Sequence, residues 1–125
     1  MTIARIGIIG TGVMGTDHAR ILQAGVAGGM LACVQDVSRQ RAVALAGETG
    51  ARLFEDAMAL IADPDIDAVM VCSPDPTHHG LALAAIAAGK PVLVEKPLAT
   101  TLAEAREIMA AEMAGGRRLV QVGFM

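Results

Sequence analysis

Short aliphatic runs alternate with longer segments of helical periodicity along the whole chain. Runs such as IGIIG, AVMVC and VLVE are almost continuously apolar, which is typical of strands buried on both faces of a parallel sheet. The predicted strands are Ala4–Ile9, Gly29–Gln35, Ala51–Phe54, Ile66–Cys72, Pro91–Val94 and Arg118–Gly123. Strands that alternate with helices pair in parallel through right-handed crossovers. We therefore predict a doubly wound α/β domain with a mostly parallel, six-stranded sheet.

Helix-capping residues mark the segments between these strands. Serine and threonine are good N-caps, glycine commonly follows the last helical turn, and the residue before a proline disfavours helix. The predicted helices run from Val13 to Ala24, from Ser38 to about Gly47, from after Phe54 through Ile61, from Thr77 to Gly89 and from Thr101 to Gly115. No repeat or low-complexity segment interrupts this order.

The size and charge of the chain narrow the classes of protein to which it belongs. With 125 residues it is long enough for one core and too short for two ordinary domains, so residues 1–125 are predicted to form a single domain. The net charge of −3 and the scattered arginines offer no footprint for nucleic acid. No apolar stretch reaches the roughly 20 residues of a membrane span, and the N-terminus lacks the pattern of a secretory signal. We expect a cytoplasmic protein that binds neither nucleic acid nor membrane.

The two cysteines, Cys33 and Cys72, each lie among aliphatic residues in a predicted strand. Small buried thiols are common core residues, so we predict core packing rather than a disulfide. Their number and spacing match no metal-binding pattern, and no metal site is predicted.

The sequence GTGVMG directly follows the first predicted strand. Its glycines match the G-x-G-x-x-G spacing of dinucleotide-binding Rossmann domains, in which they permit a tight turn, close approach to a pyrophosphate and close packing of helix on strand. The residues between the last two glycines open a helix, whose unpaired N–H groups and dipole favour a bound phosphate. The motif therefore predicts a Rossmann domain that binds a dinucleotide through Gly10, Gly12, Val13, Met14 and Gly15.

Asp36 ends the second predicted strand, where this fingerprint requires an acidic residue. A carboxylate there accepts hydrogen bonds from the hydroxyls of the adenine ribose and repels a 2′-phosphate. The predicted cofactor is therefore NAD rather than NADP. The alternative stays open that Ser38 and Arg39, which follow closely, hold the additional phosphate of NADP.

In sheets of this kind, ligands bind beyond the carboxyl ends of the strands, near the point where the strand order reverses. Three loops are expected to converge there, with the sequences TGVMG, SPDPTHH and EKP. Ser73 and Pro74 are predicted to form a stiff turn along the cofactor, and His78 to reach it from the start of the next helix. His79 is expected to cap the helix or to face solvent, which is also the alternative for His78, and His18, inside the first helix, is expected to be structural.

The stretch VLVEKPLAT ends a predicted strand in two charged residues and a proline. Beside the nicotinamide, Lys96 is placed to exchange a proton with a substrate hydroxyl as hydride moves to or from the cofactor. The chain uses lysine only at positions 90 and 96, and arginine cannot act as a base. Glu95 is predicted to pair with Lys96 or to position the nicotinamide side of the cofactor. Pro97 is predicted to fix the backbone that aims the lysine, through a cis or a trans bond. We therefore predict Lys96 as the catalytic residue and place both Glu95 and Lys96 at the cofactor.

The segments GTGVMGTDH, SPDPTHH, AAGKPVLVEKPLA and LVQVGFM occur in this order, with Asp36 between the first two. In these segments the chain resembles the Gfo/Idh/MocA oxidoreductases, and within them the inositol 2-dehydrogenases, over essentially its whole length. The resemblance implies that Lys96 is the catalytic lysine of the EKP motif. The residues that it implies along the cofactor are Ser73, Pro74, Asp75 and His78. Serine and aspartate stand here in place of the commoner threonine and asparagine.

The resemblance also implies a larger protein. Family members continue into a second α/β domain, which completes the catalytic set, binds the polyol and forms the oligomer interface. Because the chain stops at Met125, we expect the NAD(H)-binding domain of a longer inositol or sugar dehydrogenase. The isolated domain is expected to be inactive and monomeric, and the longer enzyme to be a homo-oligomer that takes a polyol or sugar as substrate. Two alternatives stay open, namely a stand-alone nucleotide sensor and a same-family enzyme that acts on another sugar or carbonyl compound.

Overall fold

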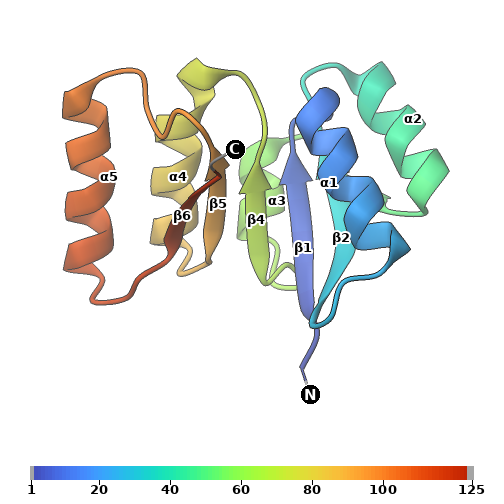
Figure 1. The fold of residues 1–125 in the computed structure, drawn as a ribbon, viewed down its shortest axis with the longest axis horizontal. Helices are drawn as coiled ribbons and strands as arrows, with labels where there is room; N and C mark the ends of the chain where they lie inside the picture. Colours follow the sequence, from blue (N-terminus) through green and yellow to red (C-terminus); the bar gives the residue numbers. More distant parts are fainter. Residues whose placement is uncertain (1, 124–125) are drawn as a thin grey trace.

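The computed structural model describes residues 2–123, in which the strands form one six-stranded sheet with every neighbouring pair parallel (Figure 1). The strand order is β3-β2-β1-β4-β5-β6. The strands are β1 Ala4–Ile9, β2 Gly29–Gln35, β3 Arg52–Leu53, β4 Ala68–Val71, β5 Val92–Glu95 and β6 Val120–Gly123. The predicted doubly wound Rossmann sheet is confirmed. Phe124 and Met125, which end the LVQVGFM segment, lie outside the described residues.

Helices cover both faces of this sheet (Figure 1). They are α1 Val13–Ala24, α2 Arg39–Thr49, α3 Ala57–Ala62, α4 His78–Ala87 and α5 Leu102–Ala114, with a short 3₁₀ helix, η1, at Asp75–Thr77. Successive strand residues point to opposite faces. Ile8 therefore packs in one core with residues of α1 and α2, and Ile9 packs in the other with residues of α3, α4 and α5. Each fully buried aliphatic side chain contributes about 1.5–3 kcal/mol, so the two cores hold the layers together with few aromatic residues.

Most element boundaries differ slightly from the sequence prediction, and two of these differences have a clear local cause. Strand β4 begins at Ala68 rather than Ile66, because the Ile66 N–H donates to the Asp63 carbonyl in a turn that buries the isoleucine before the strand starts. Helix α2 continues past Gly47 to Thr49 and ends where Gly50 adopts a φ of 77°. In both places a local hydrogen bond or a left-handed glycine decides the boundary, and the hydrophobic pattern does not show it.

Thr77 occupies the predicted N-cap position of α4, but its side chain makes no capping hydrogen bond. The Thr77 hydroxyl donates to the Pro74 carbonyl at 2.6 Å, and the chain enters α4 through η1. Pro76 lies within η1, where its fixed φ suits a tight helical start. The caps predicted at Ser38 and Thr101 are confirmed, because each side chain accepts a hydrogen bond from an N–H in the first turn of its helix.

The strand order reverses between β1 and β4. From β1 the chain proceeds outward to β2 and β3 on one side, and then returns to β4, β5 and β6 on the other. Because all strands are parallel, their carboxyl ends lie along one edge of the sheet. The loops that follow β1, β2, β4 and β5 therefore meet at this edge, as a ligand site at the switch point requires.

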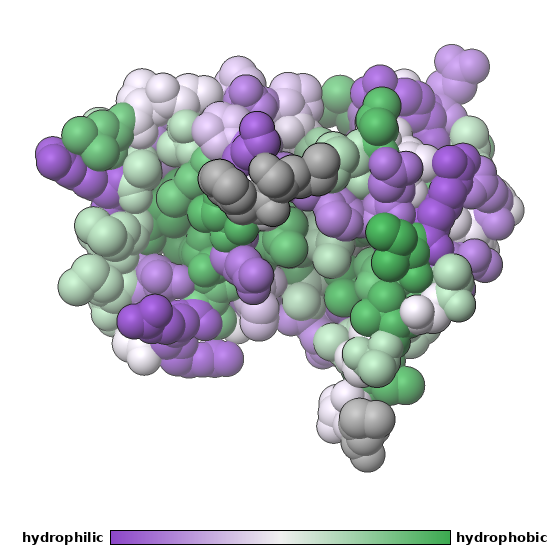
Figure 2. Space-filling model, viewed as in Figure 1, coloured by the Kyte–Doolittle hydropathy of each residue, from purple (hydrophilic) through white to green (hydrophobic). Residues whose placement is uncertain are grey.

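Figure 2 shows hydrophobic side chains gathered on the front face of the sheet, beside α1. They surround a shallow groove of about 160 Å³ that runs over β1, β4 and β5. Its lining includes Ile6, Met70, Leu93 and Leu119. Among residues 2–123, no helix is both long and apolar enough to cross a membrane.

Helix α1 packs on β1 at a distance that only glycine allows. A Cβ atom at Gly15 would lie 1.8 Å from the Gly10 carbonyl oxygen, far inside van der Waals contact. At Gly47, in the exposed part of α2, a Cβ atom would meet no atom within 4 Å. There is therefore no room for a side chain at Gly15, whereas a side chain at Gly47 would meet no obstacle.

We expect Gly15→Ala to lower the free energy of unfolding by about 1–3 kcal/mol or more, because the added methyl group forces helix and strand apart. The matched control Gly47→Ala should raise it by up to about 1 kcal/mol, because alanine favours a helix interior. Urea unfolding followed by circular dichroism measures both changes. Equal stability of the Gly15→Ala variant and the parent chain would contradict the contact.

Candidate functional site

The glycine-rich loop places the N-terminus of α1 at the tip of β1. Gly10 has a φ of 95°, and a Cβ atom there would lie 2.4 Å from the Ser73 amide nitrogen, so only glycine fits between these two loops. Gly12 is the N-cap of α1 and provides no side-chain cap. A Cβ atom at Gly12 would meet no atom within 4 Å, so open space lies in front of the helix. The free N–H groups of Val13 and Met14 therefore suit an anion such as a pyrophosphate.

Asp36 is buried and connects the end of β2 to the glycine-rich loop. Its carboxylate accepts hydrogen bonds from the Thr11 N–H at 2.7 Å, the Thr11 hydroxyl at 2.9 Å and the Ser38 N–H at 2.7 Å. The Arg41 guanidinium lies 3.2 Å away. Burial alone would raise the pKa of Asp36, but these hydrogen bonds together outweigh it and hold the pKa below its ordinary value. Sequence reasoning missed Thr11, whose hydroxyl between two glycines is the only local signal of this bond.

A pocket of about 630 Å³ opens beside Asp36, between the loops that follow β2 and β4. Asp36 and Val37 line it from the first loop, Ser73 and Pro74 from the second, and Gly10 from the tip of β1. The volume is in the range of small-molecule sites. The pocket has the size and the partly apolar lining that suit a nucleoside, and Asp36 forms part of its wall.

Arg39 also lines this pocket, but it is already paired. Its guanidinium donates to the Glu55 carboxylate at 2.9 Å, and both side chains are exposed. A 2′-phosphate that used Arg39 would have to displace this carboxylate and approach the buried charge of Asp36. The arrangement favours a cofactor without that phosphate.

His78 is fully buried and joins two of the loops. Its Nδ1 lies 2.6 Å from the Pro97 carbonyl oxygen, and its Nε2 lies 2.8 Å from the Ser73 carbonyl oxygen. The imidazole therefore holds the loop after β4 against the loop after β5. The contact of His78 with the cofactor stays a prediction. In this structure both ring nitrogens lie at hydrogen-bonding distance from carbonyl oxygens of the two loops. His79, on the next position of α4, pairs with Glu107 of α5 at 3.0 Å.

Lys96 follows directly after β5, and its side chain is exposed. The Lys96 N–H donates to the Gly123 carbonyl at 3.2 Å, and the Lys96–Pro97 peptide bond is cis. Among the described residues, no carboxylate forms an ion pair with its ammonium group. Lys90, by contrast, donates to the carbonyls of Ile61 and Asp63 at the end of α3. One of the two lysines thus has a structural role, and the other, at the sheet edge, has no ion-pair partner among residues 2–123.

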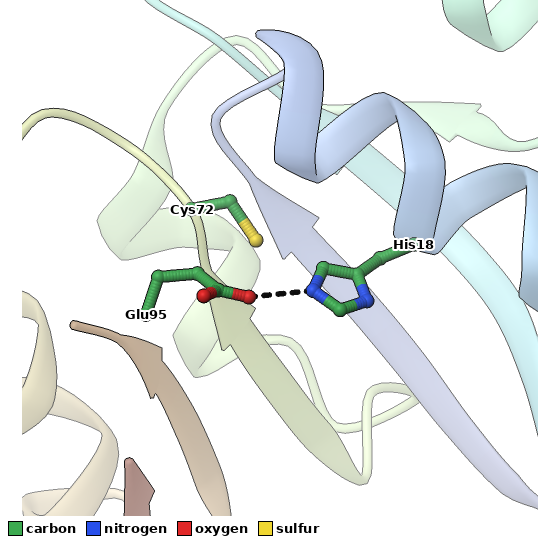
Figure 3. A group of neighbouring side chains, drawn as sticks. All are labelled: His18, Cys72 and Glu95. Atoms are coloured by element: carbon green, nitrogen blue, oxygen red, sulfur yellow. Dashed lines mark hydrogen bonds and ion pairs between the residues drawn. The ribbon is translucent and has the colours of Figure 1, made fainter. Parts of the chain in front are cut away.

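Glu95 pairs with a residue that sequence reasoning had treated as structural. His18 Nε2 of α1 lies 2.6 Å from Glu95 Oε1, and the Cys72 sulfur lies close to both (Figure 3). Cys72 and Cys33 are both free thiols, with Cys33 fully buried in the core as predicted. The contact between Glu95 and His18 joins residues far apart in the chain, and only the packing of α1 against the strand tips reveals it.

The predicted site residues therefore converge along one edge. The glycine-rich loop, Asp36 and the Ser73–Pro74 turn surround a nucleoside-sized pocket and an anion-binding helix N-terminus. Glu95 and Lys96 lie two strands away from β1 at the same edge. The pocket, the helix N-terminus and the two charged residues therefore follow one another along the carboxyl edge of the sheet.

The pKa of Asp36 is lower in the folded chain than in the unfolded chain, so the charge of Asp36 stabilises the fold at pH values above the unfolded pKa near 4. This stabilisation is lost as the pH falls through the folded pKa. We expect the urea midpoint of the parent chain to fall below pH ~4. The variant Asp36→Asn should be less stable at pH 7 and should show a smaller change over the acidic range. The exposed loop variant Asp65→Asn should keep the parent profile. Parallel profiles for the parent and Asp36→Asn would contradict the argument.

Comparisons with known proteins agree with this geometry. Inositol 2-dehydrogenase 1 of Saccharopolyspora erythraea is 52% identical over 127 residues, which cover 100% of this chain and 37% of that protein. The crystal structure of myo-inositol dehydrogenase from Lactobacillus casei, in complex with NAD(H) and myo-inositol, has a TM-score of 0.93 at 35% identity and covers 98% of this chain and 37% of that one. Biliverdin reductase from Synechocystis sp. PCC 6803, in complex with biliverdin and NADP⁺, has a TM-score of 0.88 at 31% identity and covers 95% and 37%.

The chain thus spans a little over a third of the length of these relatives. The family described as an oxidoreductase family with an NAD-binding Rossmann fold, GFO_IDH_MocA, matches residues 4–124. This match covers nearly the whole chain and includes every loop of the site described above. The chain belongs to the Gfo/Idh/MocA oxidoreductase family, as its NAD-binding Rossmann domain.

Proposed function

We propose that this chain is the NAD(H)-binding domain of an inositol or sugar dehydrogenase that transfers hydride between nicotinamide and a ring carbon of a polyol. The observation that carries the proposal is the convergence of the glycine-rich loop, Asp36 and Lys96 on one edge of the sheet. The identity of about half with inositol 2-dehydrogenases supports the substrate class. The substrate-binding residues, the oligomer and the second domain are part of the proposal, because the chain covers only part of these relatives.

The residues of the site suit the two ends of the cofactor differently. The adenosine half fits the pocket beside Asp36, whose carboxylate accepts hydrogen bonds from the ribose hydroxyls. The pyrophosphate fits the open N-terminus of α1 at Gly12. The nicotinamide end then extends toward Glu95 and Lys96. This order follows the edge from β2 across β1 and β4 to β5.

The bound cofactor supplies hydride chemistry at the nicotinamide ring. The role of this chain is to hold the cofactor and to manage the proton of the reacting hydroxyl. Lys96 is exposed at the strand tip and forms no ion pair in the described structure, so its amine is available to a substrate hydroxyl. We assign to Lys96 the transfer of that proton as hydride leaves or returns to the ring carbon.

A same-family enzyme with another carbonyl substrate is the second candidate. The similarity to biliverdin reductase, crystallised with NADP⁺, shows that this fold also occurs in a protein with a different substrate and cofactor. The buried carboxylate of Asp36 and the paired state of Arg39 favour NAD here. A stand-alone nucleotide sensor has no use for a free lysine at the nicotinamide end.

We expect the purified chain to bind NAD at least ~10-fold more tightly than NADP, because the 2′-phosphate would lie against the charge of Asp36. The variant Asp36→Ser should lose this preference while circular dichroism reports an intact fold. Isothermal titration with both nucleotides measures the change. Tighter binding of NADP by the parent chain, weakened by Arg39→Ala, would establish the alternative in which Ser38 and Arg39 hold the phosphate.

A chimera tests the catalytic proposal. When this chain replaces the matching segment of inositol 2-dehydrogenase 1 of S. erythraea, the chimera is expected to reduce NAD⁺ with myo-inositol. Lys96→Arg should lower kcat by roughly 10²–10⁴, because an arginine cannot exchange the proton, while NAD binding changes little. The matched variant Lys90→Arg should stay active, because that lysine only binds backbone carbonyls. A folded, NAD-binding chimera without activity, or full activity of Lys96→Arg, would contradict the proposal.

A further inference from the structure

Three reactive side chains from three different elements meet beside the strand tips. His18 comes from α1, Cys72 follows β4 and Glu95 ends β5 (Figure 3). The imidazole nitrogen, the thiol sulfur and the carboxylate oxygen that they offer all lie within 4.8 Å of one another. We propose that His18, Cys72 and Glu95 bind a thiophilic divalent cation such as Zn²⁺, with the fourth coordination position open. This inference does not depend on the proposed function.

The donor set matches the chemistry of zinc. One nitrogen, one sulfur and one oxygen ligand suit Zn²⁺, whereas Mg²⁺ and Ca²⁺ prefer oxygen ligands alone. Zinc–ligand bonds of about 2.0–2.3 Å place tetrahedral ligand atoms roughly 3.3–3.7 Å apart. The His18–Glu95 pair, now at 2.6 Å, must open slightly, and the sulfur, which lies within 4.8 Å of the other two ligand atoms, must approach by at most about 1 Å. Small changes in side-chain torsion angles supply movements of this size.

Neighbouring glycines keep the ligands in place and leave room for them. A Cβ atom at Gly15 would lie 3.3 Å from the Cys72 Cβ atom, so the cysteine packs directly against the start of α1. A Cβ atom at Gly123 would lie 2.9 Å from a Glu95 carboxylate oxygen, so glycine on β6 leaves space for that carboxylate. Ligands held by packing lose little freedom when a metal binds, which favours affinity.

The charge at this place also favours a cation. Among the ion pairs of residues 2–123, Glu95 is paired with His18 alone, and the two side chains are only 13% and 24% exposed, respectively. A partly buried carboxylate beside a titratable imidazole has no permanent positive partner. Zn²⁺ would balance the carboxylate and a Cys72 thiolate together, and His18 would bind as the neutral base.

Metal binding at this site must displace a proton. Burial, with a contribution from Glu95, raises the pKa of the Cys72 thiol to about 12, so the metal-free thiol is protonated. The metal binds the thiolate, and the thiol proton passes to the solvent. His18 of α1 and Glu95 of β5 are the titratable groups that face this sulfur. Affinity is therefore expected to rise with pH.

The test uses the purified 125-residue chain under reducing conditions, with Co²⁺ as a spectroscopic probe and Zn²⁺ as competitor. Cobalt in a site with a thiolate ligand gives a sulfur-to-metal charge-transfer band and strong visible absorption. We expect one equivalent of Co²⁺ to produce both signals, Zn²⁺ to abolish them, and the apparent affinity to increase from pH 6 to pH 8, because the metal displaces the thiol proton.

Matched variants identify the ligands. Cys72→Ser should abolish the charge-transfer band, and His18→Asn and Glu95→Gln should each weaken Co²⁺ binding at least ~10-fold. Cys33→Ser, which alters the buried thiol outside the cluster, and His79→Asn, which alters the surface pair with Glu107, should bind as the parent does. Urea unfolding confirms that each variant is folded. The absence of a charge-transfer band in the parent chain, or an unchanged band in Cys72→Ser, would overturn the proposal.

Discussion

Parallel pairing of β1 with β2 on one side and β4 on the other determines where the side chains of the candidate site lie. Because the order reverses at this point, the helices that follow β1 and β4 pack on opposite faces of the sheet, and the loops before them meet at the strand tips. The close contact between Gly15 and the Gly10 carbonyl then brings the N-terminus of α1 to the same place. The strand order thus places the loops at one edge of the sheet. Gly10 and Gly15 let the start of α1 lie close to β1, where a diphosphate can approach the helix N-terminus.

Asp36 links the stability of the domain to its choice of nucleotide. The same carboxylate accepts hydrogen bonds from Thr11 in the glycine-rich loop and lines the pocket that suits the adenine ribose. A substitution that alters cofactor preference therefore also removes hydrogen bonds that order the loop for the pyrophosphate. The two effects can be separated only by measuring folding and binding on the same variant, since a loss of affinity alone would not identify its cause.

The parts of this structure that depend on local chemistry could be predicted from the sequence. Aliphatic runs, Ser38 and Thr101 as caps, and the spacing from the glycines to Asp36 all express interactions between residues close in the chain. The errors arose where several local interactions compete, as at Thr77, whose hydroxyl bonds to a proline carbonyl rather than to the helix. Contacts such as that of His18 with Glu95 depend on the packing of a helix over a sheet, which no short-range pattern contains.

The alternation of side chains along β5 separates the roles of its last residues. Val94 points into the core formed with α4 and α5, so Glu95 points to the opposite face, where it meets His18 of α1. The main chain of Lys96 continues this strand by bonding to Gly123, but its side chain finds no carboxylate in the described structure. A carboxylate beside a lysine favours the charged form and opposes proton exchange. In the reaction proposed above, His18, or a cation bound with it, would engage Glu95 and leave the amine of Lys96 to a substrate hydroxyl, so that the histidine on α1 would influence a proton transfer that it does not contact.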